Sequence, residues 1–316
     1  MSPESNNSFF EYERRRLERK KSDLRLRSRI IKSIREFFSR KDYLEVETPL
    51  LIPAPAPEVH VDAISSGDLF LHTSPELCMK RLLAAGYSKI FQISKCFRNG
   101  ERGNLHMPEF TILEWYRAGI DYSTLMEECE ALFTWISNSI GLGKRIKYNG
   151  QEFDISAPWE RLSVSEAFER HASISLTTAL DKDLFDETLV NDIEPRLGVT
   201  KPTFLYDYPP SMSSLARLNY DNNLAERFEI YLAGLELANG FSELNDVGEQ
   251  RARFERDNKQ RDLLGKKRYP VSESFLRALE YMPDASGIAL GVDRLVMIFA
   301  DKTKIDDVVS FTPEEL

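Results

Sequence analysis

Apolar residues recur along the chain with two different periods, and these periods predict a mixture of helices and strands. Spacings of three to four residues, with charged residues between them, predict helices at 24–38, 75–85, 123–139, 249–263 and 273–281. Period-two alternation or short apolar runs predict strands at 43–50, 69–71, 90–93, 109–117 and 203–206. These elements follow one another without a regular strand–helix alternation, so the pattern favours an α+β fold with an antiparallel sheet.

Two strand segments carry more detail. Residues 226–232 and 234–238 are expected to form a hairpin around Gly234. Within the strand 109–117, alternate side chains face opposite sides of the sheet, with Thr111, Leu113 and Trp115 on one face and Ile112, Glu114 and Tyr116 on the other.

Composition and charge exclude several classes of protein. Of the 316 residues, 42% are hydrophobic, which is enough for a sizeable core and excludes wholesale disorder. The formal net charge of −9 makes a general nucleic-acid coat unexpected, because phosphate binding needs clustered positive charge. The chain has no apolar stretch of ~18 residues, no signal-peptide core and only three scattered cysteines, so we expect a cytoplasmic protein without a membrane partner.

A first group of chemistry-bearing residues surrounds an expected hairpin. Arg98 ends one strand, Glu101 and His106 lie in the loop, and Phe110 and Glu114 lie on the returning strand. Arginine suits phosphate because its planar fork gives two parallel charge-assisted hydrogen bonds. Taken alone, the same residues also fit a surface hairpin with a solvated Arg–Glu pair.

A second group places acids among apolar and aromatic residues around Gly234. Its polar members are Glu229, Glu236, Asn239 and Glu243. A buried carboxylate needs a partner, which can be a lysine ammonium or Mg²⁺, since Mg²⁺ takes one or two carboxylates together with nucleotide phosphates. The alternative is an amphipathic hairpin with an exposed acidic edge.

A third group of small residues lies at 287–295, where a strand is expected to turn at Gly291 and continue as a helix after Asp293. Small residues allow a ligand to approach the backbone closely, and Arg294 would lie beside helix-start amides that also favour anions. A strand–helix corner that needs glycine only for packing would have the same sequence.

Together, the three groups resemble the motifs of the class II aminoacyl-tRNA synthetases, and within them the lysyl branch. Residues 44–49 are similar to motif 1, residues 97–116 to motif 2 and residues 291–294 to motif 3. Segments similar to lysyl-specific ones lie at 74–77, 108–111, 114–116 and 236–243. The resemblance covers residues 24–311 and implies an antiparallel sheet flanked by helices, with ATP bound on the sheet, and a homodimer built through motif 1.

The arrangement of motifs is similar to that of the elongation factor P–lysine ligases, which attach (R)-β-lysine to a lysine side chain of elongation factor P. We expect residues 1–23 to form a tail or the start of a helix. Residues 24–316 would then form the catalytic domain, with a helical insertion at about 145–205 and no anticodon-binding OB-fold. Lysyl-tRNA synthetases have glycine at the third position of their glycine-rich run and the ligases have alanine, as this chain does at Ala289. One methyl group can shift the choice between substrates by ~1–3 kcal/mol.

The resemblance implies ATP and Mg²⁺ as cofactors and assigns roles around them. Arg98 would be the catalytic residue and would hold the α-phosphate and the substrate carboxylate. ATP would also be bound by His106 and Arg294 at the phosphates, by Phe110 and Glu101 at adenine, and by Glu236, which would hold Mg²⁺ together with Glu229.

The resemblance also implies a pocket for a lysine isomer. Glu76 would receive the amine near the carboxylate, Glu114, Tyr116 and Glu243 would recognise the distal ammonium, and Asn239 and Ala289 would support placement. The chain departs from the lysyl pattern at Gly100, because the expected acid comes one position later, and at Met107, which replaces an asparagine.

Three interpretations remain open at this stage. The chain could be an elongation factor P–lysine ligase, a stand-alone synthetase-like enzyme that activates another small amino acid or amine, or a non-catalytic paralogue. The phosphate arginines and metal acids argue against the last, because a paralogue without catalysis has no need of them. A negatively charged chain is also not expected to attract tRNA over long range.

Overall fold

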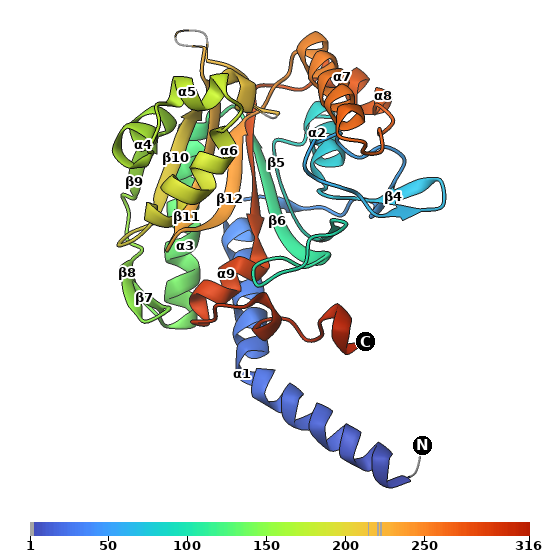
Figure 1. Cartoon of the computed structure of the whole chain (residues 1–316), viewed down its shortest axis with the longest axis vertical. Helices are drawn as coiled ribbons and strands as arrows, with labels where there is room; N and C mark the ends of the chain where they lie inside the picture. Colours follow the sequence, from blue (N-terminus) through green and yellow to red (C-terminus); the bar gives the residue numbers. More distant parts are fainter. Residues whose placement is uncertain (1–2, 214, 220, 222) are drawn as a thin grey trace.

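The computed structural model describes residues 3–213, 215–219, 221 and 223–316, and one eight-stranded sheet organises it (Figure 1). Six strands pair in antiparallel fashion, and the two edge strands run parallel to their neighbours, so the α+β prediction is confirmed. The strand order is β1 (Leu44–Glu45), β5 (Lys89–Phe97), β6 (Glu109–Ala118), β13 (Ala285–Gly291), β12 (Leu235–Ser242), β11 (Ala225–Leu232), β10 (Thr203–Tyr208) and β9 (Glu160–Ser163).

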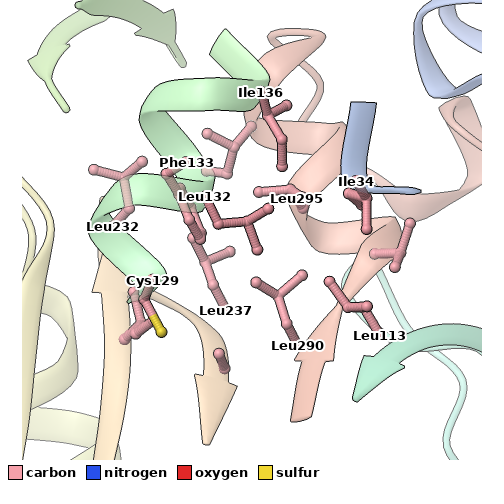
Figure 2. Packing of buried hydrophobic residues seen from close by; sticks show 14 of the residues in the cluster. Ile34, Leu113, Cys129, Leu132, Phe133, Ile136, Leu232, Leu237, Leu290 and Leu295 are labelled. Carbon is pink, nitrogen blue, oxygen red and sulfur yellow. The ribbon is translucent and has the colours of Figure 1, made fainter. Parts of the chain in front are cut away.

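One face of the sheet is covered by helices that enclose the main hydrophobic core. These are α1 (Pro3–Arg40), α3 (Tyr122–Ile140) and α9 (Val292–Phe299). Figure 2 shows Ile34 of α1, Leu132 of α3 and Leu295 of α9 meeting Leu113 and Leu290 of the sheet, and each of these five side chains is fully buried. The N-terminal half of α1 extends away from the body of the molecule (Figure 1).

The remaining helices pack at the other side of the sheet and leave part of its second face open to a cavity. They are α2 (Glu76–Ala84), α7 (Val247–Leu263) and α8 (Glu273–Leu279), together with α4 (Val164–His171), α5 (Leu176–Asp181) and α6 (Phe185–Thr188). Strand alternation separates the two faces. On β6, Leu113 and Trp115 enter the main core, whereas Glu114 and Tyr116 point to the second face, as predicted.

The expected strand at 43–50 was wrong in length, because only Leu44 and Glu45 pair with β5. Val46 adds one more hydrogen bond to Phe91, and the chain then leaves the sheet before Pro49, which has no N–H to donate. The segment beyond it enters a small separate sheet of β2 (Leu51–Ile52), β4 (Leu69–Leu71) and β3 (Ser65–Ser66).

The segment 145–205 is not wholly helical. It opens with a hairpin of β7 (Arg145–Tyr148) and β8 (Gln151–Asp154), whose turn residues Asn149 and Gly150 both have positive φ. It then contributes β9, which pairs with β10 at the edge of the large sheet, so the helices occupy only its middle. The expected boundary at residue 23 falls inside α1, which is one continuous helix.

The hairpin predicted around Gly234 is present. Ala233 and Gly234 have φ values of 54° and 72°, the two positive angles that a tight two-residue hairpin turn requires. A Cβ atom on Gly234 would lie 3.2 Å from the Glu194 carbonyl, so the turn also fits closely against the insertion. In the part of the chain that the structure describes, no helix is both long enough and apolar enough to cross a membrane.

Candidate active site

Strand register brings four of the predicted site residues into one row. Glu114 of β6 lies opposite Ala289 of β13, Ala289 lies opposite Asn239 of β12, and Asn239 lies opposite Glu229 of β11. Residues paired directly across strands point to the same face of a sheet. The row therefore crosses the second face of the sheet, with Ala289 between the acid at one end and the amide and acid at the other.

A neighbouring row explains one glycine. Gly287 lies between Tyr116 and Phe241. A Cβ atom at this position would lie 2.2 Å from the Tyr116 ring and 2.5 Å from Glu243 Oε1. Only glycine therefore leaves room for the tyrosine and the carboxylate to lie side by side.

A shift in strand pairing places Glu236 at the site. Ile230 pairs with Ala238 and the next residue, Tyr231, pairs with Glu236, so β12 has one extra residue at this point. A bulge of this kind turns a side chain toward the face that regular alternation would deny it. As a result, Glu229 and Glu236 line the same cavity.

This central cavity has a volume of about 460 Å³ and lies on the open part of the second face. It is lined by nine of the residues that the sequence singled out, namely Arg98, Glu101, His106, Phe110, Glu229, Glu236, Asn239, Ala289 and Arg294. Side chains from all three groups singled out in the sequence thus converge on a space within the size range of ligand sites.

Three arginines line the central cavity, and two of them, Arg98 and Arg294, were predicted from the sequence. Arg294, near the start of α9, donates to the Glu236 carbonyl at 2.7 Å and lies 2.6 Å from His106 Nε2. Burial and the nearby Arg294 charge lower the pKa of His106, so its imidazole is neutral and can accept that hydrogen bond. Arg98 lies 3.8 Å from Glu101, and its guanidinium is 5.0 Å from the centre of the Phe110 ring.

The start of α9 is fixed by Asp293, to which the sequence analysis assigned no role. Asp293 is buried and accepts hydrogen bonds from the Thr111 amide at 2.7 Å and from Arg27 Nη1 at 2.5 Å. Arg27 also donates to the Thr111 hydroxyl at 2.8 Å. Arg27 belongs to α1, so the long N-terminal helix is tied directly to the turn that presents Arg294.

Glu229 has a shell of donors that the sequence also did not indicate. Its Oε2 accepts from the hydroxyls of Tyr208 at 2.6 Å and Tyr231 at 2.7 Å, and its Oε1 accepts from Arg227 at 2.5 Å. Oε1 keeps one lone pair for a further partner. Burial and, after it, the Glu229 charge raise the pKa of Glu236.

These two acids fit a Mg²⁺ ion that is completed by phosphate oxygens. Among the described residues there is no group of three or more acid, histidine or cysteine side chains that could hold a metal by itself. Mg²⁺ commonly binds one or two carboxylates plus substrate phosphates, so a two-acid site beside two arginines matches its chemistry.

The remaining residues predicted to bind the substrate form a buried acidic cluster beside the row. Glu76, Glu114, Tyr116 and Glu243 meet there around Lys80, which the sequence analysis did not single out. Lys80 Nζ lies 2.7 Å from Glu76 and 2.5 Å from Glu243, and its side chain is fully buried. Glu76 and Lys80 are four residues apart on α2, a spacing that could have indicated the pair.

Glu114 is the most enclosed acid of the cluster. It accepts hydrogen bonds from the Ser74 hydroxyl at 2.6 Å and the Tyr116 hydroxyl at 3.0 Å. Burial, with the nearby Glu76 charge, raises the pKa of Glu114 to about 8. Burial also raises the pKa of Tyr116, so this phenol stays neutral and donates its proton. The cluster contains three acids and one lysine, so a further positive charge would be electrostatically favourable there.

The antiparallel sheet and the charged cavity on its open face are those expected of a class II aminoacyl-tRNA synthetase. The family model for the class II tRNA synthetases (D, K and N) matches residues 6–315. The chain therefore belongs to the class II tRNA synthetase family.

Curated relatives narrow the likeness further. The chain is 41% identical to an elongation factor P–(R)-β-lysine ligase from Proteus mirabilis, over 92% of this chain and 94% of the relative. It is 44% identical to the ligase of the same name from Haemophilus influenzae, over 90% and 93%, and 38% identical to that from Vibrio cholerae, over 92% and 95%. The resemblance to this ligase family is confirmed.

Proposed function

We propose that the protein is an ATP-dependent ligase that activates a lysine isomer, (R)-β-lysine, as an adenylate and transfers it to a lysine side chain of elongation factor P. The relatives that match nearly the whole chain carry this name. The observation that carries the proposal is the central cavity, where Arg98, Arg294, Glu229 and Glu236 converge beside a buried acidic cluster. Two cations suit a triphosphate, and the acids suit a substrate with two ammonium groups.

In the first step, a carboxylate oxygen of the lysine isomer attacks the α-phosphorus of ATP, and the bond to the β-phosphate breaks to release pyrophosphate. Arg98 would hold the α-phosphate and the attacking carboxylate, while His106 and Arg294 would bind the outer phosphates. Phe110 and Glu101 would bind adenine. This chemistry depends on positioning and on neutralising charge, so no protein nucleophile is required.

In the second step, the amine nitrogen of the acceptor lysine attacks the acyl carbon of the adenylate. The amide bond forms as the bond between the acyl carbon and the phosphate oxygen breaks, and AMP leaves with the electron pair. The two protons that the ammonium nitrogen loses pass to solvent.

Glu229 and Glu236 would hold Mg²⁺ against the phosphate oxygens. When bound, the ion would neutralise charge that develops on the leaving phosphates. Hydrogen bonds from Tyr208, Tyr231 and Arg227 orient Glu229 for this task, because they occupy the carboxylate lone pairs that would not face the ion.

The choice of β-lysine rests on Ala289. Its methyl group lies in the row between Glu114 and Asn239. Glu76 would receive the amine near the carboxylate, and Glu114, Tyr116 and Glu243 would bind the distal ammonium. The methyl narrows the floor of the site, which disfavours an amine on the α-carbon relative to one moved by one carbon.

We further propose that the protein acts as a homodimer built through the motif 1 region, as a single catalytic domain with its insertion at 145–205. Exposed Leu44, Leu50 and Leu51 lie in this region and would be covered in a dimer. An enzyme that uses ATP to modify a translation factor belongs in the cytoplasm, and the chain's net charge of −9 does not favour tRNA.

The deciding experiment incubates the protein with ATP, Mg²⁺ and each lysine isomer. ATP–pyrophosphate exchange should be stronger with (R)-β-lysine than with α-lysine, and purified elongation factor P should gain the mass of one lysyl group. Exchange with another amino acid and no gain of mass would instead support a different stand-alone synthetase-like enzyme. No exchange with any amino acid would point to a non-catalytic paralogue.

A further inference from the structure

A second cavity adjoins the central one. Its volume is about 420 Å³, and His60, Arg227, Glu229 and Glu236 line both spaces. We call it the side cavity. The four shared side chains place the side cavity next to the central cavity, at the two acids beside which the phosphates of ATP would lie.

The insertion supplies the outer wall of the side cavity. Phe185 of α6 and Leu189 and Val190 of the following π-helical turn, Leu189–Ile193, line it together with Met212. Phe185 is 2% exposed and Val190 is 53% exposed, so the apolar wall runs from the interior to the surface. Turns of π-helix are rare and occur frequently at functional sites.

The charge of the side cavity favours a cation. Asp186 and Glu194 line it in addition to Glu229 and Glu236, and Arg227 is already paired with Glu229 at 2.5 Å. The Tyr231 hydroxyl lies 3.1 Å from Glu194 Oε1 and 2.7 Å from Glu229 Oε2, so these two acids lie close together. Burial raises the pKa of Glu194, and the charges of Glu229 and Glu236 add to the effect. An anion such as departing pyrophosphate would be repelled from this space.

We propose that the side cavity receives the side chain of the acceptor lysine, with its methylene groups against the apolar wall and its amine directed to the central cavity. The inference rests on the proposed function, in which a protein amine must reach the adenylate. A lysine side chain has a four-carbon stem and a single charged end, which matches an apolar channel that leads to acids. A free lysine isomer fits less well, because its carboxylate would face the same acids.

The test separates the two steps of the reaction. Val190→Trp would narrow the mouth of the side cavity, and Val199→Trp is the matched control, since both valines are exposed, at 53% and 51%, and belong to the same insertion. Each variant is assayed for ATP–pyrophosphate exchange with (R)-β-lysine and for mass gain of elongation factor P. We expect Val190→Trp to keep exchange within about twofold and to lose transfer by about tenfold or more, because misplacement of a reacting group costs rate steeply.

The other outcomes contradict the channel in distinguishable ways. If Val190→Trp keeps both steps at the level of Val199→Trp, the acceptor does not pass Val190. If exchange falls as much as transfer, the side cavity admits the free amino acid or ATP instead. If the protein without substitutions shows no exchange, the proposed function is wrong, and the proposed role of the side cavity is wrong with it.

A second pair of variants tests the side cavity by changing its charge, so the result does not depend on the size of the tryptophan side chain. Asp186→Lys places a cation in the side cavity, and Glu187→Lys changes the neighbouring exposed acid, which does not line it. Asp186→Lys should raise the KM for elongation factor P by about tenfold relative to Glu187→Lys, because like charges repel. The KM for (R)-β-lysine in the exchange assay should stay the same in both variants. Equal KM values for elongation factor P would overturn the proposal.

Discussion

Glu114, which we propose binds the distal ammonium, shows how burial can change the pKa of a residue in such a role. Both of its oxygens accept a hydroxyl hydrogen bond, and it has no exposure to water. With a pKa raised to about 8, mainly by burial, the carboxyl is largely protonated at neutral pH. An ammonium group that binds there must therefore displace a proton, and substrate affinity becomes linked to pH.

This linkage gives a prediction about pH. In the proposed role, only the ionised form of Glu114 binds the ammonium, so the KM for (R)-β-lysine should fall as the pH rises toward about 8 and should level off above it. The slope below the pKa should be about tenfold per pH unit for a single proton. ATP–pyrophosphate exchange measured between pH 6 and 9, with the amino acid varied, gives the profile. Glu114→Gln should have a higher and flatter KM, and an unchanged slope in this variant would contradict the assignment.

Ala289 gives a prediction about specificity. Ala289→Gly removes the methyl group between Glu114 and Asn239, and the preference for (R)-β-lysine over α-lysine should fall by about tenfold, as expected for one methyl group in a pocket wall. The ratio of kcat/KM values in the exchange assay measures it. Ala285→Gly makes the same change on the same strand, away from the central cavity, and should leave the ratio unchanged. Equal ratios in the two variants would remove Ala289 from the specificity argument.

At the scale of elements, the alternation of apolar and polar residues predicted individual strands, but it did not predict how neighbouring strands pair in register. The strand at 109–117 and the hairpin around Gly234 follow from local patterns, so both were predicted. The extra residue that turns Glu236 to the site arises from pairing between β11 and β12, and no local pattern marks it. The hairpin at 145–154 did carry a signal, Asn149-Gly150, which the emphasis on helices in that segment passed over.

The contact between α1 and α9 gives a prediction about ATP. Arg27→Met removes two hydrogen bonds that hold Asp293 and Thr111, which should loosen the turn that presents Arg294. The KM for ATP should rise by about fivefold or more, since a buried charged hydrogen bond is worth about 1.5–3 kcal/mol. Arg25→Met, an exposed arginine on the same helix, is the control. A lower melting temperature with an unchanged KM for ATP would make Arg27 a purely structural residue.

At the scale of the whole molecule, sequence motifs indicated most of the residues that line the central cavity, whereas the residues that support them became visible only in the structure. Arg98, Arg294 and Glu236 stand in segments that resemble family motifs, whereas Glu229 was singled out as an acid among apolar and aromatic residues. Supporting residues such as Arg27 were not, because its partner Asp293 lies 266 positions away in the chain. Only the folded sheet brings such pairs together, so the supporting shell is the part of the site that a single sequence hides.

The oligomeric state is tested at the same scale. Leu44 is 50% exposed on β1, at one edge of the large sheet, and Leu51 nearby is 45% exposed. Leu44→Asp should therefore produce a monomer by light scattering after gel filtration, because a charge in an apolar interface is costly. Leu264→Asp changes a leucine that is 51% exposed elsewhere and should stay dimeric. A monomeric unmodified protein would contradict the dimer.

The two-sided sheet also constrains how these strands can evolve. On β6, Leu113 and Trp115, which pack in the core, alternate along the sequence with Glu114, which we propose contacts the substrate. Inserting one residue before Leu113 would turn Trp115 toward the central cavity and Glu114 into the hydrophobic core, so stability and substrate recognition would be lost together. A substitution can change one face of the sheet alone, whereas an insertion or deletion in the strand disrupts both faces.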